Sequence, residues 1–193
     1  MDPLDYFNRE LDDHRAVQNR TQETLAAPFQ EMLRLWVAAI ERGNKILFFG
    51  NGGSAADAQH LAAELVVRFI SDRKPIAAIA LNTDTSALTA GANDLGYDEV
   101  FARQIDALGA PGDVVVGITT SGTSPNVVKA LQMARAKGLV TTALTGRDGG
   151  LMPELADVAL IVPATSTRRI QEMHITLGHM LCGALEKSLK LVD

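Results

Sequence analysis

The chain has 193 residues, enough for one sizeable hydrophobic core but short for two. Hydrophobic residues make up 47% of the chain and charged residues 21%, a balance typical of an ordinary globular domain. The net charge of −5 argues against a general nucleic-acid binder, and no segment approaches the roughly 18 apolar residues of a membrane-spanning helix.

Cysteine usage and the N-terminus both predict a cytoplasmic protein. Cys182 is the single cysteine, so no internal disulfide can form, which fits a reducing compartment. It lies in an apolar helical stretch, which predicts a buried, inert thiol. The acidic start "MDPLDYFNRELDDH" lacks the apolar run of a signal peptide. We therefore expect neither a membrane nor a nucleic acid among the partners.

The first 43 residues are predicted to be helical. Pro28 is expected to divide the helical pattern of residues 4–42 into two helices, and Gly43 with Asn44 to end the second. The second helix has a wide apolar stripe, whereas the first is more polar. Because a long helix with a partial apolar face often packs on another subunit, we expect residues 1–43 to serve oligomer packing. Residues 44–193 would form the core of the same single domain.

Short apolar runs alternate with helical segments from residue 45 onward. The predicted strands are "KILFFG", "IAAIAL", "DVVVGIT", "VTTALTG" and "DVALIVP". The predicted helices between and after them run to about 69, over 86–90, 99–108, to 137 and over 170–189. This alternation predicts a doubly wound α/β domain with five parallel strands and added N-terminal helices. In such folds ligands bind at the carboxyl ends of the strands.

The loop after the first predicted strand, "GNGGSAAD", is rich in glycine. Its glycines can expose backbone amides, and Ser54 is a candidate cap for the helix that follows. The loop has neither the spacing of a dinucleotide fingerprint nor the lysine of a P-loop. A tight strand-to-helix turn and a ligand loop therefore remain equally open.

The loop after the third predicted strand, "TTSGTSPN", is rich in hydroxyl groups. Ser124 is the expected N-cap, with Pro125 at the first helical position. A cap needs one hydroxyl, and this loop offers five in six positions. We therefore favour a phosphate-binding loop over a simple cap.

Two helices carry groups suited to proton transfer or metal binding. His60 and Glu64 are four residues apart and share one helix face, which suits a metal site or a proton-transfer pair, although many such pairs are only solvated. The last helix carries Gln171, His174 and His179. Each histidine is either a functional group or a hydrogen-bonded packing residue.

Several segments together resemble a known family. They are "FFGNGGSAADAQHLAAELVVRF", "ALTAGANDLGYDEVFARQI", "GDVVVGITTSGTSPNVVKAL", "ALTGRDGG" and "RIQEMHITLGHML". The chain resembles the sugar isomerase (SIS) domain family over nearly its whole length, and within it the phosphoheptose isomerases. The resemblance implies a flavodoxin-like SIS fold, a homotetramer with active sites at subunit interfaces, and one zinc ion per subunit. It also implies conversion of sedoheptulose 7-phosphate to D-glycero-D-manno-heptose 7-phosphate, the first step toward nucleotide-activated heptose for lipopolysaccharide or other surface glycans.

The resemblance also assigns roles to residues of this chain. Glu64 resembles the general base and His179 the partnering acid. The metal positions are His60, Glu64, Gln171 and His179. Glu64 and Gln171 also count as substrate contacts, together with Asn51, Gly52, Gly53, Asn93, Asp94, Thr119, Thr120, Ser121 and Ser124.

The last helix leaves one assignment open. Gln171 and His179 are eight residues apart, about 12 Å along a helix, so one ion would bind both only with long reaches. Either Gln171 contacts mainly the sugar, or the site combines subunits. His174 lies between them and is the rival to His179.

Two other functions compete with the isomerase. One relative of the family binds the bacterial replication initiator, and it lacks the carboxylate and the histidine at the Glu64 and His179 positions. A regulatory SIS module that senses a sugar phosphate would keep the hydroxyl loop but would not need this acid and base. Both groups are present here, which favours the enzyme.

Overall fold

Five parallel strands form one sheet in the order β2-β1-β3-β4-β5, as the sequence predicts. The computed structural model describes residues 2–192. The strands are β1 (Ile46–Gly50), β2 (Ala78–Ala80), β3 (Val114–Ile118), β4 (Val140–Gly146) and β5 (Val158–Val162). The interior strand β1 pairs with β2 on one side and with the central strand β3 on the other.

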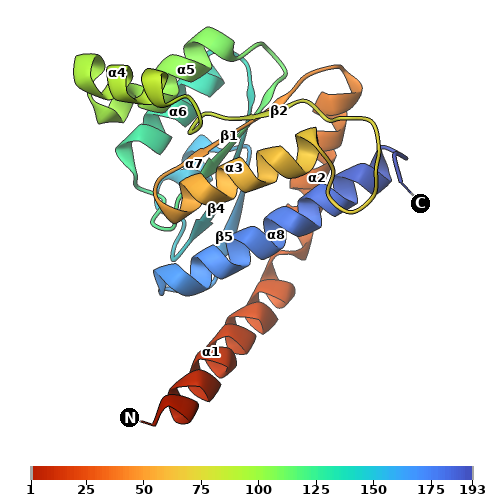
Figure 1. Ribbon diagram of the computed structural model, residues 1–193, viewed down its shortest axis with the longest axis vertical. Helices are drawn as coiled ribbons and strands as arrows, with labels where there is room; N and C mark the ends of the chain where they lie inside the picture. Colours follow the sequence, from red (N-terminus) through yellow and green to blue (C-terminus); the bar gives the residue numbers. More distant parts are fainter. Residues whose placement is uncertain (1, 193) are drawn as a thin grey trace.

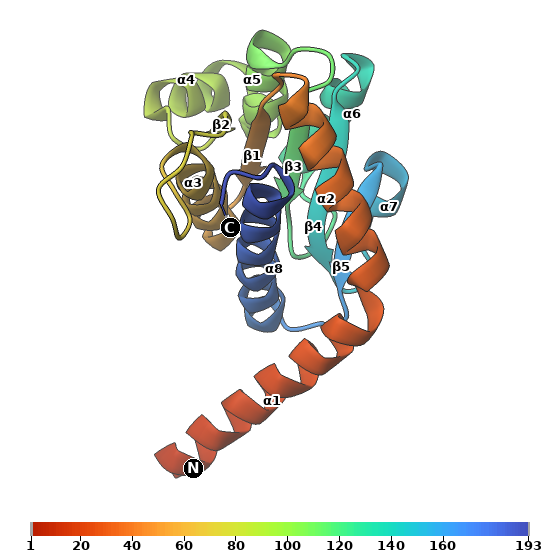
Figure 2. The ribbon, with the colours of Figure 1, turned by 90° about the vertical axis from the view of Figure 1, so that its right-hand side faces the viewer.

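Helices cover both faces of this sheet (Figures 1 and 2). One face packs against α2 (Ala26–Glu41), α3 (Gly53–Val66) and α8 (Thr167–Ser188). The other packs against α5 (Val100–Leu108), α6 (Pro125–Ala136) and the short α7 (Met152–Leu155). The remaining helices are α1 (Pro3–Thr24), α4 (Thr85–Leu95) and the 3-10 turn η1 (Tyr97–Glu99). The doubly wound architecture is thus confirmed.

The two hydrophobic cores follow from the alternation of side chains along β1. Phe48 points to one face, where its ring meets Trp36 of α2 edge-on at a centroid distance of 5.6 Å. Phe49 points to the other face and packs on Phe101 of α5 at 5.3 Å. Because both faces of a parallel sheet are buried, the strand reads as one continuous apolar run.

The break between the first two helices differs from the sequence prediction. Leu25, rather than Pro28, separates α1 from α2, and Pro28 is the third residue of α2. Proline is tolerated there because the first amides of a helix have no intrahelical acceptor. From this break α1 extends away from the sheet, with the N-terminus at its far end (Figure 2).

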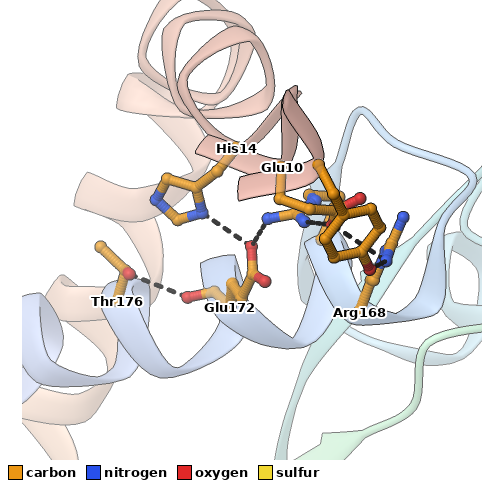
Figure 3. A network of polar contacts seen from close by, with 7 residues as sticks. Glu10, His14, Arg168, Glu172 and Thr176 are labelled. Carbon is orange, nitrogen blue, oxygen red and sulfur yellow. Dashed lines mark hydrogen bonds and ion pairs between the residues drawn. The ribbon is translucent and has the colours of Figure 1, made fainter. Parts of the chain in front are cut away.

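Ion pairs fix α1 to the beginning of α8 (Figure 3). Glu10 pairs with both Arg168 and Arg169, and Glu172 accepts from Arg169 at 2.6 Å and contacts His14 Nδ1 at 2.7 Å. Two arginines in the first turn oppose the dipole of α8. These carboxylates offset them, so an anionic ligand is not needed to explain the arginines.

Other boundaries shift by a few residues. Helix α3 ends at Val66 instead of about 69, and α4 runs on to Leu95. Cys182 is buried in α8, and burial raises the pKa of its thiol to about 12, as expected of an inert cysteine. Within residues 2–192 no helix is both long enough and apolar enough to cross a membrane.

Candidate active site

The glycine-rich loop and the hydroxyl-rich loop meet at the carboxyl ends of β1 and β3. Asn51 and Asn126 join them through a reciprocal pair of amide hydrogen bonds of 2.9 and 2.8 Å. The Tyr97 hydroxyl also donates to Asn51 Oδ1, at 3.1 Å. Parallel strands bring the loops to one edge, and these amides then fix their spacing.

The glycine loop leads directly into α3. Gly52 is the N-cap, with φ of 58°, so the expectation that Ser54 caps the helix is wrong. Ser54 instead lies buried within the first turn. Gly53 faces α8, where a Cβ would come within 2.5 Å of Gln171 Nε2. The missing side chain lets Gln171 approach the loop backbone.

The hydroxyl loop leads into α6. Ser124 is the N-cap and Pro125 the first helical residue, as predicted. Within residues 2–192, however, the Ser124 hydroxyl caps no amide of α6, and it lies 3.0 Å from the Thr119 hydroxyl. Ser121 Oγ accepts from the Thr123 amide and hydroxyl. The first amides of α6 thus have no side-chain cap, the condition under which a helix N-terminus binds an anion.

His60, Glu64 and His179 come together between α3 and α8. His60 Nε2 lies 2.8 Å from His179 Nε2 and 3.3 Å from Glu64 Oε1. One ligand atom from each of the three residues lies within 4.8 Å of the others. Helices α3 and α8 pack tightly at this level, because Gly178 has no Cβ to collide with Leu61.

The donor set fits a zinc ion. Two imidazole nitrogens and a carboxylate oxygen are typical zinc ligands, with bonds of about 2.0–2.2 Å. In a tetrahedral site such bonds place the ligand atoms about 3.3 Å apart, close to the separations seen here. His60 is half-exposed, so the group is accessible from solvent.

The other two residues of α8 fall outside this group. His174 is fully buried, and its Nε2 lies 3.0 Å from the Thr145 carbonyl oxygen, so Nε2 carries the hydrogen. It is therefore a hydrogen-bonded packing histidine. Gln171 lies against Gly53, about 10 Å along α3 from His60, and so faces the glycine loop in this structure.

A carboxyl group with a shifted pKa lies one turn before His60 on α3. Burial raises the pKa of Asp57 to about 6, while His60 lowers it. Its Oδ2 is buried and has no hydrogen-bond partner among the described residues. The site therefore holds a second carboxyl group that a proton or a cation would stabilise.

The second expected substrate segment is on α4. Asn93 donates to Asp94 Oδ1 at 2.7 Å, and both side chains are exposed. Tyr97, just beyond α4, is the residue that reaches Asn51. The contact with the glycine loop is therefore made by Tyr97 of η1, two residues after the end of α4.

Besides Asp57, the sequence analysis missed three residues near the site. Asn126 and Tyr97 orient Asn51, and the Phe69 ring packs on His179 with centroids 5.4 Å apart. Asn126 follows Pro125 directly, so a polar residue in the first turn was the available signal. Phe69 gave no such signal, because its contact depends on the packing of two distant helices.

Comparison with known proteins shows which family the chain resembles in sequence and in fold. The SIS domain family profile matches residues 11–146. A phosphoheptose isomerase of Paramagnetospirillum magneticum is 56% identical over 181 residues, covering 94% of each chain, and one of Helicobacter pylori strain P12 is 51% identical over 183 residues, covering 95% of each. The structure of a phosphoheptose isomerase from Neisseria gonorrhoeae is 42% identical, with a TM-score of 0.90 over 95% of this chain and 98% of that one.

Proposed function

The chain belongs to the SIS domain family, and we propose that it catalyses the phosphoheptose isomerase reaction. The substrate is the ketose sedoheptulose 7-phosphate, and the product is the aldose D-glycero-D-manno-heptose 7-phosphate. The reaction supplies the precursor of nucleotide-activated heptose for lipopolysaccharide or another surface glycan, in the cytoplasm. The observation that carries the proposal is the His60–Glu64–His179 group beside a glycine loop and a hydroxyl loop.

Aldose–ketose isomerisation moves a proton between adjacent carbons through an enediol. Glu64 takes a proton from C1 of the ketose and returns it to C2. One carboxylate oxygen of Glu64 faces His60, which leaves Oε2 for the substrate. His179 is the partnering acid, which serves the two sugar oxygens.

A zinc ion fits the donor set described above, with His60, Glu64 and His179 as its ligands in each subunit. When bound, zinc polarises the sugar carbonyl and stabilises negative charge on oxygen. Gln171, which faces the glycine loop, contacts mainly the sugar. A fourth ligand role for Gln171 would require its side chain to turn toward His179.

The remaining substrate contacts follow from the two loops. Thr119, Thr120, Ser121 and Ser124 hold the phosphate at the start of α6, where the helix dipole and the uncapped amides favour an anion. Asn51, Gly52 and Gly53 contact the sugar hydroxyls, and Asn93 with Asp94 closes the other side. In this arrangement the reacting carbons lie at α3 and α8, and the phosphate lies at α6.

The active assembly is a homotetramer of one SIS domain per chain. Residues 1–43 provide packing helices and residues 44–193 the α/β core. Three large apolar side chains near the metal group are exposed. Val67 and Ile70 follow the end of α3, and Met180 is next to His179 on α8. A second subunit covering them would also close the half-exposed site.

Removal and return of metal tests the proposal. The protein, stripped with a chelator, is incubated with sedoheptulose 7-phosphate, and the aldose is quantified by proton NMR with and without added Zn²⁺. We expect aldose only after Zn²⁺ is returned. A folded, zinc-loaded protein that leaves the ketose unchanged would contradict the proposal, and would favour the initiator-binding or sugar-sensing alternatives.

A further inference from the structure

A buried ion pair lies about two helical turns beyond His179 along α8. Arg73 Nε and Glu186 Oε1 are 2.7 Å apart, and the two side chains are only 1% and 3% exposed. Arg73 comes from the irregular segment 67–77 after α3, and Glu186 comes from the last turn of α8. A carboxylate at a helix C-terminus is disfavoured by the helix dipole, so this glutamate depends on its arginine.

Arg73 also terminates the helix that carries Glu64. Its Nη2 donates to the Glu64 carbonyl oxygen and its Nη1 to the Leu65 carbonyl oxygen, each at 2.8 Å. The last carbonyl groups of a helix have no intrahelical donors. The guanidinium supplies those donors and thereby fixes the backbone of Glu64 itself.

Glu186 in turn positions an aromatic ring on His179. Its Oε1 accepts from the Phe69 amide at 3.2 Å. The Phe69 ring then packs on the His179 imidazole, with centroids 5.4 Å apart. Gly183 makes the space for the ring, since a Cβ there would come within 3.2 Å of Phe69 Cε1.

We propose that Arg73, Glu186 and Phe69 form a positioning clamp for the metal group. The clamp fixes Glu64 through its carbonyl oxygen and His179 through its ring, so it sets the separation of groups on α3 and α8. None of the three residues needs to touch the substrate. The kinetic part of this inference rests on the proposed function, whereas the zinc-affinity part can be measured without the reaction.

The clamp predicts a specific kinetic signature. The phosphate loop lies at the start of α6 and makes none of these contacts, so substrate affinity is preserved. Mutation of a residue that orients a metal ligand typically lowers metal affinity or activity by about 10- to 100-fold. Weakening the clamp is therefore expected to lower kcat and zinc affinity while leaving KM unchanged.

A matched ion pair at the other end of the sheet provides the control. Lys45 and Asp113 also pair, and the Asp113 side chain is 2% exposed. They precede β1 and β3, at the edge opposite the active site. Glu186→Gln and Asp113→Asn each remove one buried carboxylate charge, and both are expected to reduce stability.

The experiment measures zinc affinity by competition with a chromogenic chelator and, separately, kcat and KM for sedoheptulose 7-phosphate. For Glu186→Gln we expect zinc affinity and kcat to fall about tenfold or more, with KM within about threefold. For Asp113→Asn we expect zinc affinity within about twofold of the unmodified protein. Equal zinc affinities for the two variants would overturn the proposal.

A second variant covers the case in which Glu186→Gln does not fold. Phe69→Leu keeps the ion pair but removes the ring, and it is expected to lower zinc affinity and kcat in the same direction. Unchanged values for Phe69→Leu would also overturn the clamp. If the unmodified protein binds zinc but does not isomerise the sugar, the proposed function fails while the zinc titrations still decide the clamp.

Discussion

Two histidines on one helix show how strongly position decides the chemistry of a residue. His174 and His179 are both on α8, five residues apart, and therefore face different sides. His174 is buried and bonded to Thr145, and burial lowers its pKa to about 4, although the bond to the carbonyl raises it. His179 instead meets His60 at the half-exposed site.

The buried His174 predicts a pH-dependent stability. Its pKa is lower in the folded protein than the usual 6.5, so below pH 6.5 the unfolded chain binds more protons. Stability contributed by neutral His174 is complete above pH 6.5 and is lost progressively down to about pH 4. Between pH 7 and 5 the His174 contribution to the free energy of unfolding should fall by roughly 2 kcal/mol. Asp57, whose pKa burial raises to about 6, offsets part of this fall because its carboxyl group takes up a proton in the folded protein.

Urea unfolding at the two pH values measures this effect. The His174→Gln variant, which cannot titrate, should lose stability at pH 7 but show a smaller fall toward pH 5. If the variant and the unmodified protein lose the same free energy between these values, another group is responsible.

At the scale of elements, the N-terminus of α6 is separated from the metal group. Ser124 begins the helix, but its hydroxyl bonds Thr119, so the first amides have no side-chain cap. This separation predicts that variants at the start of α6 change substrate binding, whereas variants at the metal group change the rate of the chemical step.

Removing hydroxyls from this loop should therefore weaken substrate binding. We expect Ser121→Ala and Ser124→Ala each to raise KM about tenfold, since a hydrogen bond to a charged group contributes about 1.5–3 kcal/mol. The value of kcat should remain within about threefold. Steady-state kinetics decide, with Thr24→Ala as a control, because that exposed hydroxyl bonds only the backbone of α1. An unchanged KM in both serine variants would place the phosphate elsewhere.

At the scale of the whole molecule, α1 is the least covered element. Leu4, Phe7 and Leu11 recur at helical spacing, and their side chains are 62%, 57% and 44% exposed. Figure 1 shows the helix extending from the body of the protein. Apolar side chains exposed along one stripe are typical of an interface, which supports our proposal that α1 packs in a tetramer.

A charge placed in this stripe should break the assembly. We expect Phe7→Glu to shift the protein from tetramer to smaller species in light scattering, and to lower activity if the site needs a second subunit. Ala16→Glu introduces the same charge on a different face of α1 and should remain tetrameric. If the Phe7→Glu variant keeps the mass of the unmodified protein in light scattering, α1 is not part of the interface.

The sequence predicts best what depends on local pattern. Continuous apolar runs located all five strands, and the glycine-rich and hydroxyl-rich loops lie at the carboxyl ends of β1 and β3, as predicted. The helix break at Leu25 and the cap at Gly52 were misplaced, because Pro28 fits the first turn of a helix and glycine takes the left-handed cap. The Arg73–Glu186 pair joins residues 113 positions apart, so no periodicity could reveal it.

The most direct test of the central claim is proton NMR of sedoheptulose 7-phosphate incubated in deuterated buffer with the zinc-loaded protein. If Glu64 carries the proton through an enediol, new heptose anomeric signals should appear, with deuterium at C2 of the aldose. Glu64→Gln keeps the size of the side chain and removes the base, so these signals should fall by at least about a hundredfold. An aldose formed equally fast by the Glu64→Gln variant would contradict the assignment of the base, and an unchanged ketose with the unmodified protein would contradict the proposed reaction.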